Sequence, residues 1–456
     1  MNVAEAVGRT LVERGVRQVF GVVGSGNFHV TNAMVDAGAR FVAARHEGGA
    51  ATMTDAYGRM SGEVAVLSVH QGCGLTNAMT GTTEAAKSRT PMVVLAAQAT
   101  QPRSNFYVDQ EMLAMAVGAV PMRIGSADSA VADAAAAVDL ARRERRTVLL
   151  NLPLDLQGDE VEDLTIPAPL ATPGPVVPSD EDLNLLIEAL EGAQRPVFVA
   201  GRGARGPGCG PALADLAEAS GALLATSAVA KGLFNGNQWN LDVSGGFSSP
   251  VAAELIGGAD LIVGWGCALN MWTMRHGRLI GEGTRVLQVD DDPDVIGAQR
   301  PGAQGVVGDV RVTAEAALAR VGGTSPGYRS EQVRARIASE IRWRDVPYEE
   351  ESSGERIDPR TLTIALDDLL PEDRMVSVDS GNFMGYPSMY LSGPDQWGFC
   401  FTQAFQSIGL GLATAIGAAL AQPDRLPVAA LGDGGGLMSI AEMETVARLG
   451  FPMVVV

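Results

Sequence analysis

The stretch Val428–Gly436 reads VAALGDGGG and indicates how this part of the chain folds. Apolar residues run directly into Asp433, which stands among glycines, and a helix is expected from Leu437 onward. This order is typical of a strand that ends at the carboxyl edge of a parallel sheet. Asp433 offers a hard oxygen to Mg²⁺, and Gly434–Gly436 let backbone N–H groups approach phosphate oxygens. An ordinary strand–turn–helix joint is the alternative interpretation.

The composition of the 456-residue chain fits a soluble α/β enzyme with several domains. Hydrophobic residues make up 46% and charged residues 19% of it. A net charge of −19 disfavours nucleic acid and anionic membrane as partners. We find no apolar run of the ~18 residues that a membrane span needs.

The four cysteines, Cys73, Cys209, Cys267 and Cys400, are widely scattered and form no CxxC pair. This spacing argues against a zinc site and against a disulfide framework. The first residues have an amphipathic helical pattern with charges throughout, rather than the pattern of a signal peptide. We therefore expect a cytoplasmic protein.

Short β-branched runs alternate with helical stretches in the first part of the chain, which predicts a parallel sheet of βαβ units. A segment with five prolines, residues 165–179, follows and predicts an extended linker. The first domain is therefore expected at residues 1–164. Its predicted strands are Gln18–Val22, Arg40–Ala43, Val64–Val69, Met92–Ala96 and Thr147–Leu152.

A second α/β block is predicted at residues 180–325, beginning with the helix Asp180–Glu191. A glycine-rich stretch, Gly203–Gly210, could cradle a nucleotide, but its spacing does not match the dinucleotide fingerprint. Residues 326–357 are charged and polar and predict a connection with helical pieces. The predicted strands of the block are Pro196–Ala200, Leu223–Thr226, Asp260–Gly264 and Arg285–Val289.

A third α/β block is predicted at residues 358–456, so the expected fold is α/β with three consecutive parallel-sheet domains. Its final residues, Pro452–Val456, read as a fresh strand. A parallel strand without a following helix leaves an uncovered apolar edge, so we expect the natural chain to continue past Val456. The other predicted elements are strands Met375–Val378 and Pro427–Leu431 and helices Ser407–Ala421 and Met438–Leu449.

Three of the four histidines lie within the first 70 residues, each just beyond a predicted strand: His29, His46 and His70. Ligands in open α/β sheets bind at the carboxyl ends of strands, so these histidines predict a site there. The alternative is that each caps a turn. Glu47 follows His46 at the start of a small-residue helix, where it could transfer protons or simply be favoured by the helix dipole.

Together these segments resemble the thiamine-diphosphate-dependent 2-oxo-acid enzymes, the family of acetolactate synthases, 2-oxo-acid decarboxylases such as benzoylformate decarboxylase, and their carboligase relatives. The likeness is carried by four motifs in order: Phe20–Gly24, Arg45–Ala51, Gly74–Ala78 and Gly432–Gly434. It implies a pyrimidine-binding domain, a middle Rossmann-like domain and a diphosphate-binding domain. It also implies a homodimer or homotetramer with active sites between subunits, a small-molecule 2-oxo acid as substrate, and thiamine diphosphate and Mg²⁺ as cofactors.

The resemblance implies roles for individual residues. Glu47 matches the glutamate that hydrogen-bonds the aminopyrimidine ring and promotes loss of the cofactor's C2 proton, and Asp433 matches the Mg²⁺ ligand. Ile408 matches the bulky residue that props the cofactor in its bent form, and the Gln406 carbonyl would accept from the exocyclic amine. The other residues expected to bind the cofactor are Asn77, Ser380, Gly381, Asn382, Gly432, Gly434 and Gly435.

The sequence departs from the family pattern at three points. Gly435 stands where a hydroxyl residue is usual, and Gln406 replaces a common glycine. The family's next metal ligand would lie beyond Val456. This last departure keeps open a third interpretation, a catalytically silent or scaffold subunit that lacks a full metal site.

Two reactions fit the resemblance. Gln110-Glu111 lies where acetolactate synthases carry such a pair near the substrate, which favours decarboxylation of a 2-oxo acid followed by carboligation. Ser25 and His70 lie where benzoylformate decarboxylase carries a serine and a histidine, which favours decarboxylation to an aldehyde. Gly266–Asn270 replaces the arginine-bearing stretch with which synthases hold FAD, so FAD is doubtful.

Overall fold

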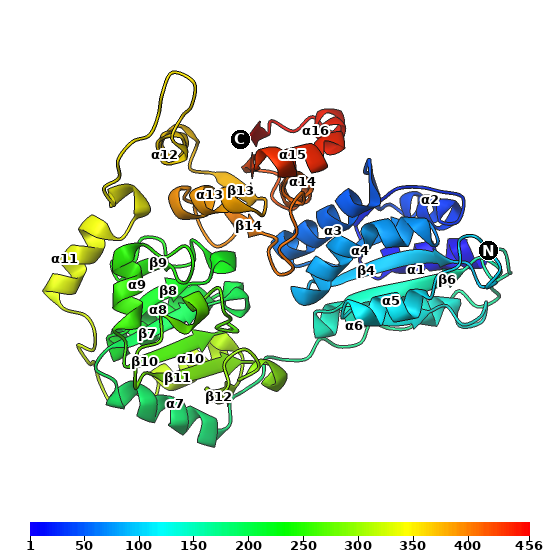
Figure 1. Cartoon of the computed structure of the whole chain (residues 1–456). Coiled ribbons are helices and arrows are strands. Elements are labelled where there is room, and N and C mark those ends of the chain that lie inside the picture. The colour runs from blue at the N-terminus through cyan, green and yellow to red at the C-terminus, as the bar shows by residue number, and fades with distance from the viewer. The chain divides into compact units, whose positions relative to one another are not determined.

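A computed structural model describes all 456 residues of the chain, which form two compact units. The first unit comprises Met1–Pro173, Met375–Met384 and Cys400–Val456. The second comprises Gly174–Arg374 and Gly385–Phe399. The chain contains three sheets flanked by helices (Figure 1), so the predicted class of three parallel-sheet α/β blocks is confirmed. No helix has both the length and the apolar character that crossing a membrane requires.

The first sheet is entirely parallel and has the strand order β2-β1-β3-β4-β6-β5. Its strands are β1 Gln18–Gly21, β2 Arg40–Ala43, β3 Ala65–Val69, β4 Met92–Gln98, β5 Val120–Arg123 and β6 Thr147–Pro153. The helices are α1 Val3–Glu13, α2 Phe28–Asp36, α3 Glu47–Ser61, α4 Cys73–Lys87, α5 Gln110–Ala116 and α6 Ala130–Glu144. The predicted strands are confirmed to within two residues. The edge strand β5 was not predicted, because it is only partly buried and lacks a clear apolar run.

The second sheet is also parallel, with the order β12-β11-β10-β7-β8-β9. Its strands are β7 Pro196–Ala200, β8 Leu223–Thr226, β9 Asn240–Val243, β10 Leu261–Trp265, β11 Arg285–Asp290 and β12 Gln304–Val307. The helices are α7 Asp180–Gly192, α8 Cys209–Ser220, α9 Pro250–Gly257, α10 Val310–Leu318 and α11 Glu331–Glu340. The two edge strands, β9 and β12, escaped prediction for the same reason as β5.

The third sheet has the order β14-β13-β15-β16. Its strands are β13 Arg374–Val378, β14 Phe399–Phe401, β15 Leu426–Ala430 and β16 Val454–Val455. The helices are α12 Pro359–Leu369, α13 Gly385–Tyr390, α14 Gly411–Ala421, α15 Asp433–Met438 and α16 Met443–Leu449. The predicted final strand is present, paired in parallel with β15, but it is shorter than expected. The five-part domain division proposed from composition remains a prediction.

Two helix boundaries in this last block differ from prediction. The helix expected from Ser407 begins only at Gly411, because Gln406 and Gly409 have positive φ angles of 62° and 91° that interrupt a right-handed helix. The helix expected from Leu437 begins already at Asp433. It stops at Ser439 and is followed by a 3₁₀ turn, Ile440–Glu442, and by α16.

Helix α14 packs closely against α3 in the first unit. A Cβ atom at Gly417 would lie 2.2 Å from the carbonyl oxygen of Met53, so only glycine permits this approach. Ala50 and Met53 of α3 share one hydrophobic core with Ile416 of α14. Helices of the first and the third block are therefore joined within one core.

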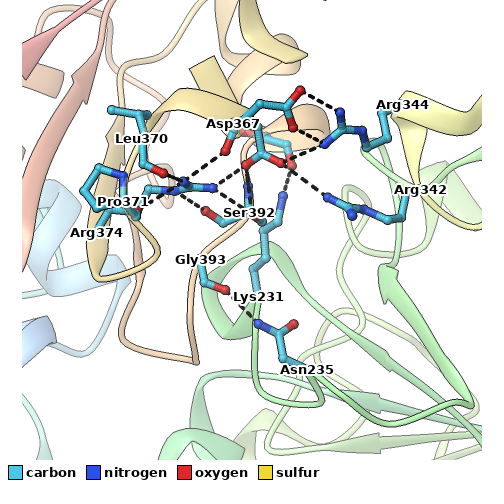
Figure 2. A network of polar contacts seen from close by, with 12 residues as sticks. Lys231, Asn235, Arg342, Arg344, Asp367, Leu370, Pro371, Arg374, Ser392 and Gly393 are labelled. Atoms are coloured by element: carbon cyan, nitrogen blue, oxygen red, sulfur yellow. Dashed lines mark hydrogen bonds and ion pairs between the residues drawn. The ribbon is translucent and has the colours of Figure 1, made fainter. Parts of the chain in front are cut away.

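A buried polar network ties α12 to the segment that follows α13 in the second unit (Figure 2). The Asp367 carboxylate accepts from the backbone N–H and the hydroxyl of Ser392, both at 2.8 Å, and from the guanidinium of Arg374. Arg374 also donates to the carbonyls of Leu370, at 3.0 Å, and Pro371, at 3.2 Å. The side chains of Asp367 and Arg374 are each only 4% exposed, so neither charge can be solvated if its partner is lost.

Replacing Asp367 with Asn should lower the free energy of unfolding by about 1–3 kcal/mol, because a buried donor loses its charged acceptor. We expect this in the urea-induced unfolding of the protein. The matched control is Asp368→Asn. Asp368 is exposed and pairs with Arg344 on the surface, so its replacement should leave the transition nearly unchanged. Equal effects of both changes would contradict the proposed importance of the buried network.

Candidate active site

Glu47 begins α3 directly after β2, at the carboxyl edge of the first sheet. The preceding residue, His46, caps the helix, because its ring Nδ1 accepts from the backbone N–H of Gly48 at 3.0 Å. The Glu47 side chain is half-buried, and its Oε2 accepts from the Asn77 side chain on α4 at 3.1 Å. Asn77 therefore holds one carboxylate oxygen, while Oε1 makes no hydrogen bond within the chain and could bind a ligand.

Ser25 and His70 form a pair, and they follow strands that neighbour each other in the sheet. The Ser25 hydroxyl lies 3.4 Å from Nε2 of His70, and Nδ1 of His70 lies 2.9 Å from the carbonyl oxygen of Gln71. Since a carbonyl only accepts, Nδ1 carries the proton, and Nε2 faces the hydroxyl. The Phe106 ring packs edge-on against the His70 ring, with the two ring centroids 5.1 Å apart. Imidazole and hydroxyl together could donate or accept a proton.

The strand order explains why these residues gather. Ser25 follows β1, Glu47 follows β2 and His70 follows β3, and these three strands are neighbours in the order β2-β1-β3. Parallel strands bring their carboxyl ends to one edge. His29 lies on α2, is exposed and contacts Phe28 at 5.5 Å.

Gln110 lies at the start of α5 and is buried. Its Nε2 donates to the Asn151 side chain at 2.6 Å, and its Oε1 accepts from the backbone N–H of Gly72 at 3.4 Å. Both ends of the amide are thus bonded to protein groups. In this structure Gln110 holds the loop after β3, which carries His70.

A buried carboxylate organises the carboxyl end of β13. Asp379, 0% exposed, accepts from the backbone N–H groups of Ser380 at 2.7 Å, Gly409 at 3.0 Å and Leu410 at 3.2 Å. Burial raises the pKa of Asp379, although these N–H donors act in the opposite direction. One side chain therefore joins the loop after β13 to the loop before α14.

The predicted cofactor residues of these two loops lie together. The hydroxyl of Ser380 donates to the carbonyl of Gln406 at 3.2 Å, which leaves that carbonyl a second lone pair. Ile408 is 44% exposed, so part of its apolar side chain is open to a ligand. Gly381 has a φ of 100°, and Asn382 starts a short 3₁₀ turn with its side chain exposed.

The glycines after β15 form the first turns of α15 rather than the loop that the sequence predicted. Asp433 is exposed, and its Oδ1 accepts from the N–H of Gly434 at 2.8 Å. A Cβ at Gly435 would lie 2.0 Å from Oδ2 of Asp379. Glycine is therefore required there by close packing, which explains why the usual hydroxyl residue is missing.

The groups around Asp433 that could bind Mg²⁺ are its own carboxylate and the neighbouring glycine backbone. No three His, Cys, Asp or Glu side chains gather into a metal-binding cluster anywhere in the chain. Mg²⁺ is commonly held by one or two carboxylates, with phosphate oxygens and water completing its shell. An exposed carboxylate beside glycine backbone fits such a site.

The glycine-rich stretch of the second unit has a packing role. It forms a 3₁₀ turn, Arg202–Arg205, and then the start of α8. The backbone N–H of Gly203 donates to the carbonyl of Gly266 at 3.0 Å. The close contact between these two loops accounts for glycine at both positions without a bound nucleotide.

Three buried acidic residues that bond to loops of the site were not predicted: Asp379, Glu84 and Glu442, each 2% exposed or less. Asp379 could have been found, because it follows β13 as Asp433 follows β15. The other two lie within helical stretches with no local signal.

Comparison with known proteins agrees with this architecture. The N-terminal, central and C-terminal domains of the thiamine pyrophosphate enzymes, the first and last described as TPP-binding, match residues 1–118, 183–317 and 379–456. A probable 2-ketoarginine decarboxylase of Pseudomonas aeruginosa is 31% identical over 100% of the chain, which covers 81% of that protein. A sulfoacetaldehyde acetyltransferase of Rhodobacter capsulatus is 28% identical over 100% of the chain and 81% of its own length.

The acetolactate synthase isozyme 3 large subunit of Escherichia coli is 26% identical over 99% of the chain, which covers 81% of that protein. The printed names of these relatives describe different activities. The three family domains nevertheless match this chain in the order N-terminal, central and C-terminal. The chain therefore belongs to the family of thiamine-diphosphate-dependent enzymes that act on 2-oxo acids.

Proposed function

We propose that the protein is a thiamine-diphosphate- and Mg²⁺-dependent enzyme that decarboxylates a 2-oxo acid and joins the remaining fragment to a carbonyl acceptor, as an acetolactate synthase does. The observation that carries this proposal is the half-buried Glu47, oriented by Asn77 at 3.1 Å with Oε1 unbonded. Two of the relatives are named acetyltransferase and acetolactate synthase, which supports transfer to an acceptor.

When bound, thiamine diphosphate supplies the nucleophilic carbon and the electron sink that decarboxylation requires. Glu47 would hold a proton at the aminopyrimidine ring nitrogen, and Asn77 would keep its carboxylate in register. Asp433 would hold Mg²⁺ against the diphosphate, beside the backbone of Gly432, Gly434 and Gly435.

The remaining residues would shape the cofactor site. The exposed Ile408 offers an apolar surface for the bend of the cofactor. The Gln406 carbonyl keeps a lone pair for an amine donor. Ser380, Gly381 and Asn382 lie on the loop next to it.

We further propose a homo-oligomer with the active site between subunits. Large apolar side chains around α15 are strongly exposed: Leu437 is 71%, Met438 70% and Ile440 56% exposed. A patch of this kind is typical of a surface that another protein covers. Sedimentation of the protein with and without cofactor would test this.

The Ser25–His70 pair favours a second candidate function, decarboxylation to an aldehyde without ligation. An imidazole that faces a hydroxyl at 3.4 Å could deliver a proton in place of an acceptor carbonyl. A relative named as a probable decarboxylase is consistent with this alternative.

A panel of 2-oxo acids, supplied with thiamine diphosphate and Mg²⁺, with and without acceptor aldehydes, tests these functions together. We expect CO₂ release that needs both cofactors, needs no added FAD and yields a hydroxyketone or acyl-transfer product with an acceptor. An aldehyde as the sole product would favour the second function. A protein that binds neither cofactor and releases no CO₂ would be a silent or scaffold subunit.

Replacing His70 with Ala should lower kcat by about 10²-fold or more while changing the affinity for thiamine diphosphate little, because a positioned proton donor contributes about 10²–10⁴-fold. Steady-state kinetics and calorimetric titration of the cofactor measure the two effects separately. The control is His29→Ala, since His29 is exposed on α2. An unchanged kcat in His70→Ala would mean that His70 only caps a turn and takes no part in proton transfer.

A further inference from the structure

Two buried glutamates in the first unit each accept backbone N–H groups from a loop that is distant in sequence. Glu84 lies on α4 and bonds to residues 320 and 321 positions away. Glu442 lies after α15 and bonds to residues 397 and 396 positions away. A carboxylate of the first block thus binds backbone of the third block, and a carboxylate of the third block binds backbone of the first. Both bind next to residues of the candidate site.

Glu84 fixes the segment that leads into the loop of Gln406 and Ile408. Its Oε1 accepts from the N–H of Ala404 at 2.8 Å, and its Oε2 accepts from the N–H of Phe405 at 2.5 Å. The very next residue is Gln406, whose φ of 62° must be maintained by its surroundings. The Glu84 side chain is 0% exposed, so water cannot take over these bonds.

Arg59 completes this arrangement. Its Nη2 lies 2.6 Å from Oε1 of Glu84, and its Nη1 donates to the carbonyl of Phe401 at 3.0 Å, so both ends of the segment are held. Asp55 accepts from Arg59 Nε at 2.9 Å on the same helix. Burial acts to raise the pKa of Glu84, but Arg59 and the N–H groups of Ala404 and Phe405 outweigh it and lower the pKa. The Glu84 carboxylate is therefore ionised at neutral pH.

Glu442 fixes the backbone directly before Glu47. Its Oε1 accepts from the N–H of Arg45 at 2.9 Å and of His46 at 3.1 Å, and its Oε2 accepts from the Thr445 hydroxyl at 2.7 Å. Glu442 is 2% exposed, and Thr445 is 0% exposed. The carboxylate therefore sets where α3 starts, and with it the direction of the Glu47 side chain.

We propose that Glu442 and Glu84 are positioning residues of the active site: Glu442 aligns Glu47 for proton transfer, and Glu84 aligns the Gln406–Ile408 loop for cofactor binding. This inference rests on the proposed function of Glu47 and Ile408. Neither glutamate lies among the groups that would contact the cofactor. Misplacing a reacting group by about 1 Å can cost about 10²-fold in rate, so small backbone shifts matter.

The two positions should give opposite kinetic signatures. Glu442→Gln should lower kcat by about 10²-fold and leave the Kd of thiamine diphosphate within about threefold, because Glu47 acts on a proton rather than on affinity. Glu84→Gln should raise that Kd by about tenfold or more, with a smaller effect on kcat. A general loss of folding would lower kcat and raise the Kd in the same variant, so it would not produce this split.

Two readouts do not depend on turnover. In the protein without cofactor, hydrogen exchange of the peptide that contains Arg45 and His46 should accelerate in Glu442→Gln, since these N–H groups lose a charged acceptor. In the loaded protein, hydrogen–deuterium exchange at C2 of bound thiamine diphosphate, followed by NMR, should slow in Glu442→Gln but not in Glu84→Gln.

The matched control is Glu444→Gln. Glu444 is two residues from Glu442, its side chain is 47% exposed, and it pairs with Arg45 and Arg448 on the surface. It should behave as wild type in every measurement. If Glu442→Gln does not fold, Thr445→Val removes one donor to the same carboxylate and should shift kcat in the same direction by a smaller factor.

The outcomes separate the two proposals. A wild-type protein that binds no thiamine diphosphate and releases no CO₂ overturns the proposed function. An active wild type whose Glu442→Gln and Glu84→Gln variants keep wild-type kcat, Kd and C2 exchange overturns the positioning roles alone. Equal effects of both variants on kcat and Kd overturn the division of roles.

Discussion

Glu47→Gln should leave the fold and the binding of thiamine diphosphate largely intact while slowing CO₂ release from a 2-oxo acid by orders of magnitude. Glutamine fills the same space beside Asn77, which lies 3.1 Å from the native carboxylate. It cannot hold or release the proton that the proposed reaction needs, a loss of about 10²–10⁴-fold for acid–base catalysis. CO₂ release under saturating cofactor and calorimetric titration of thiamine diphosphate give the two quantities.

The control for this change is Glu63→Gln, an exposed carboxylate just beyond the end of α3. This variant should keep wild-type turnover. A loss of turnover in Glu47→Gln would then be due to the location of Glu47 in the site and not to the removal of one negative charge. Turnover near the wild-type level in Glu47→Gln would rule out the proposed role of this carboxylate. A structure of an oligomer with the Glu47 side chain directed into solvent would argue against it as well.

Gly435→Ala should both destabilise the cofactor-free protein and weaken thiamine diphosphate binding by about 10²-fold. The added Cβ would lie 2.0 Å from Oδ2 of Asp379, so either α15 or that buried carboxylate must move. Overpacking of this kind costs about 1–3 kcal/mol of stability. A displaced Asp379 would also release Gly409 and Leu410, which flank the cofactor loop. Thermal unfolding without cofactor and titration with thiamine diphosphate and Mg²⁺ measure the two effects.

The neighbouring Gly434 supplies a matched control for stability. A Cβ there would meet no atom within 4 Å, so Gly434→Ala should leave the unfolding temperature of the cofactor-free protein unchanged or slightly raised. Equal unfolding temperatures of the two variants would mean that α15 adapts freely. The packing argument for glycine at position 435 would then fail.

Most strands and the first-sheet residues of the site could be predicted from local sequence. The buried β7 reads as a continuous apolar run and β3 as a run broken only by Ser68, because both faces of a parallel sheet are covered. Ser25, Glu47 and His70 could be assigned to one edge, because the carboxyl ends of neighbouring parallel strands meet there. The half-exposed edge strands β5, β9 and β12 lack such runs and were missed.

The boundaries around the third sheet depended on single backbone angles. Residues 407–410 were predicted as the first turn of a helix, yet the positive φ angles at Gln406 and Gly409 delay α14 until Gly411. Asp379 draws the N–H groups of this stretch toward itself, which competes with helix formation. Such a competition depends on a residue about thirty positions earlier and leaves no periodic signal.

The amino-acid sequence by itself determined the three α/β blocks, their order and the strand ends at which Glu47 and Asp433 stand, because apolar periodicity and turn residues act over a few neighbouring positions. Only the tertiary structure decided which buried carboxylates hold those strand ends in place. Glu84 and Glu442 reach N–H groups more than 300 residues away in the chain. Their pairing follows from how α3, α4 and the last helices pack, since a buried charge is stable only where the fold brings it donors.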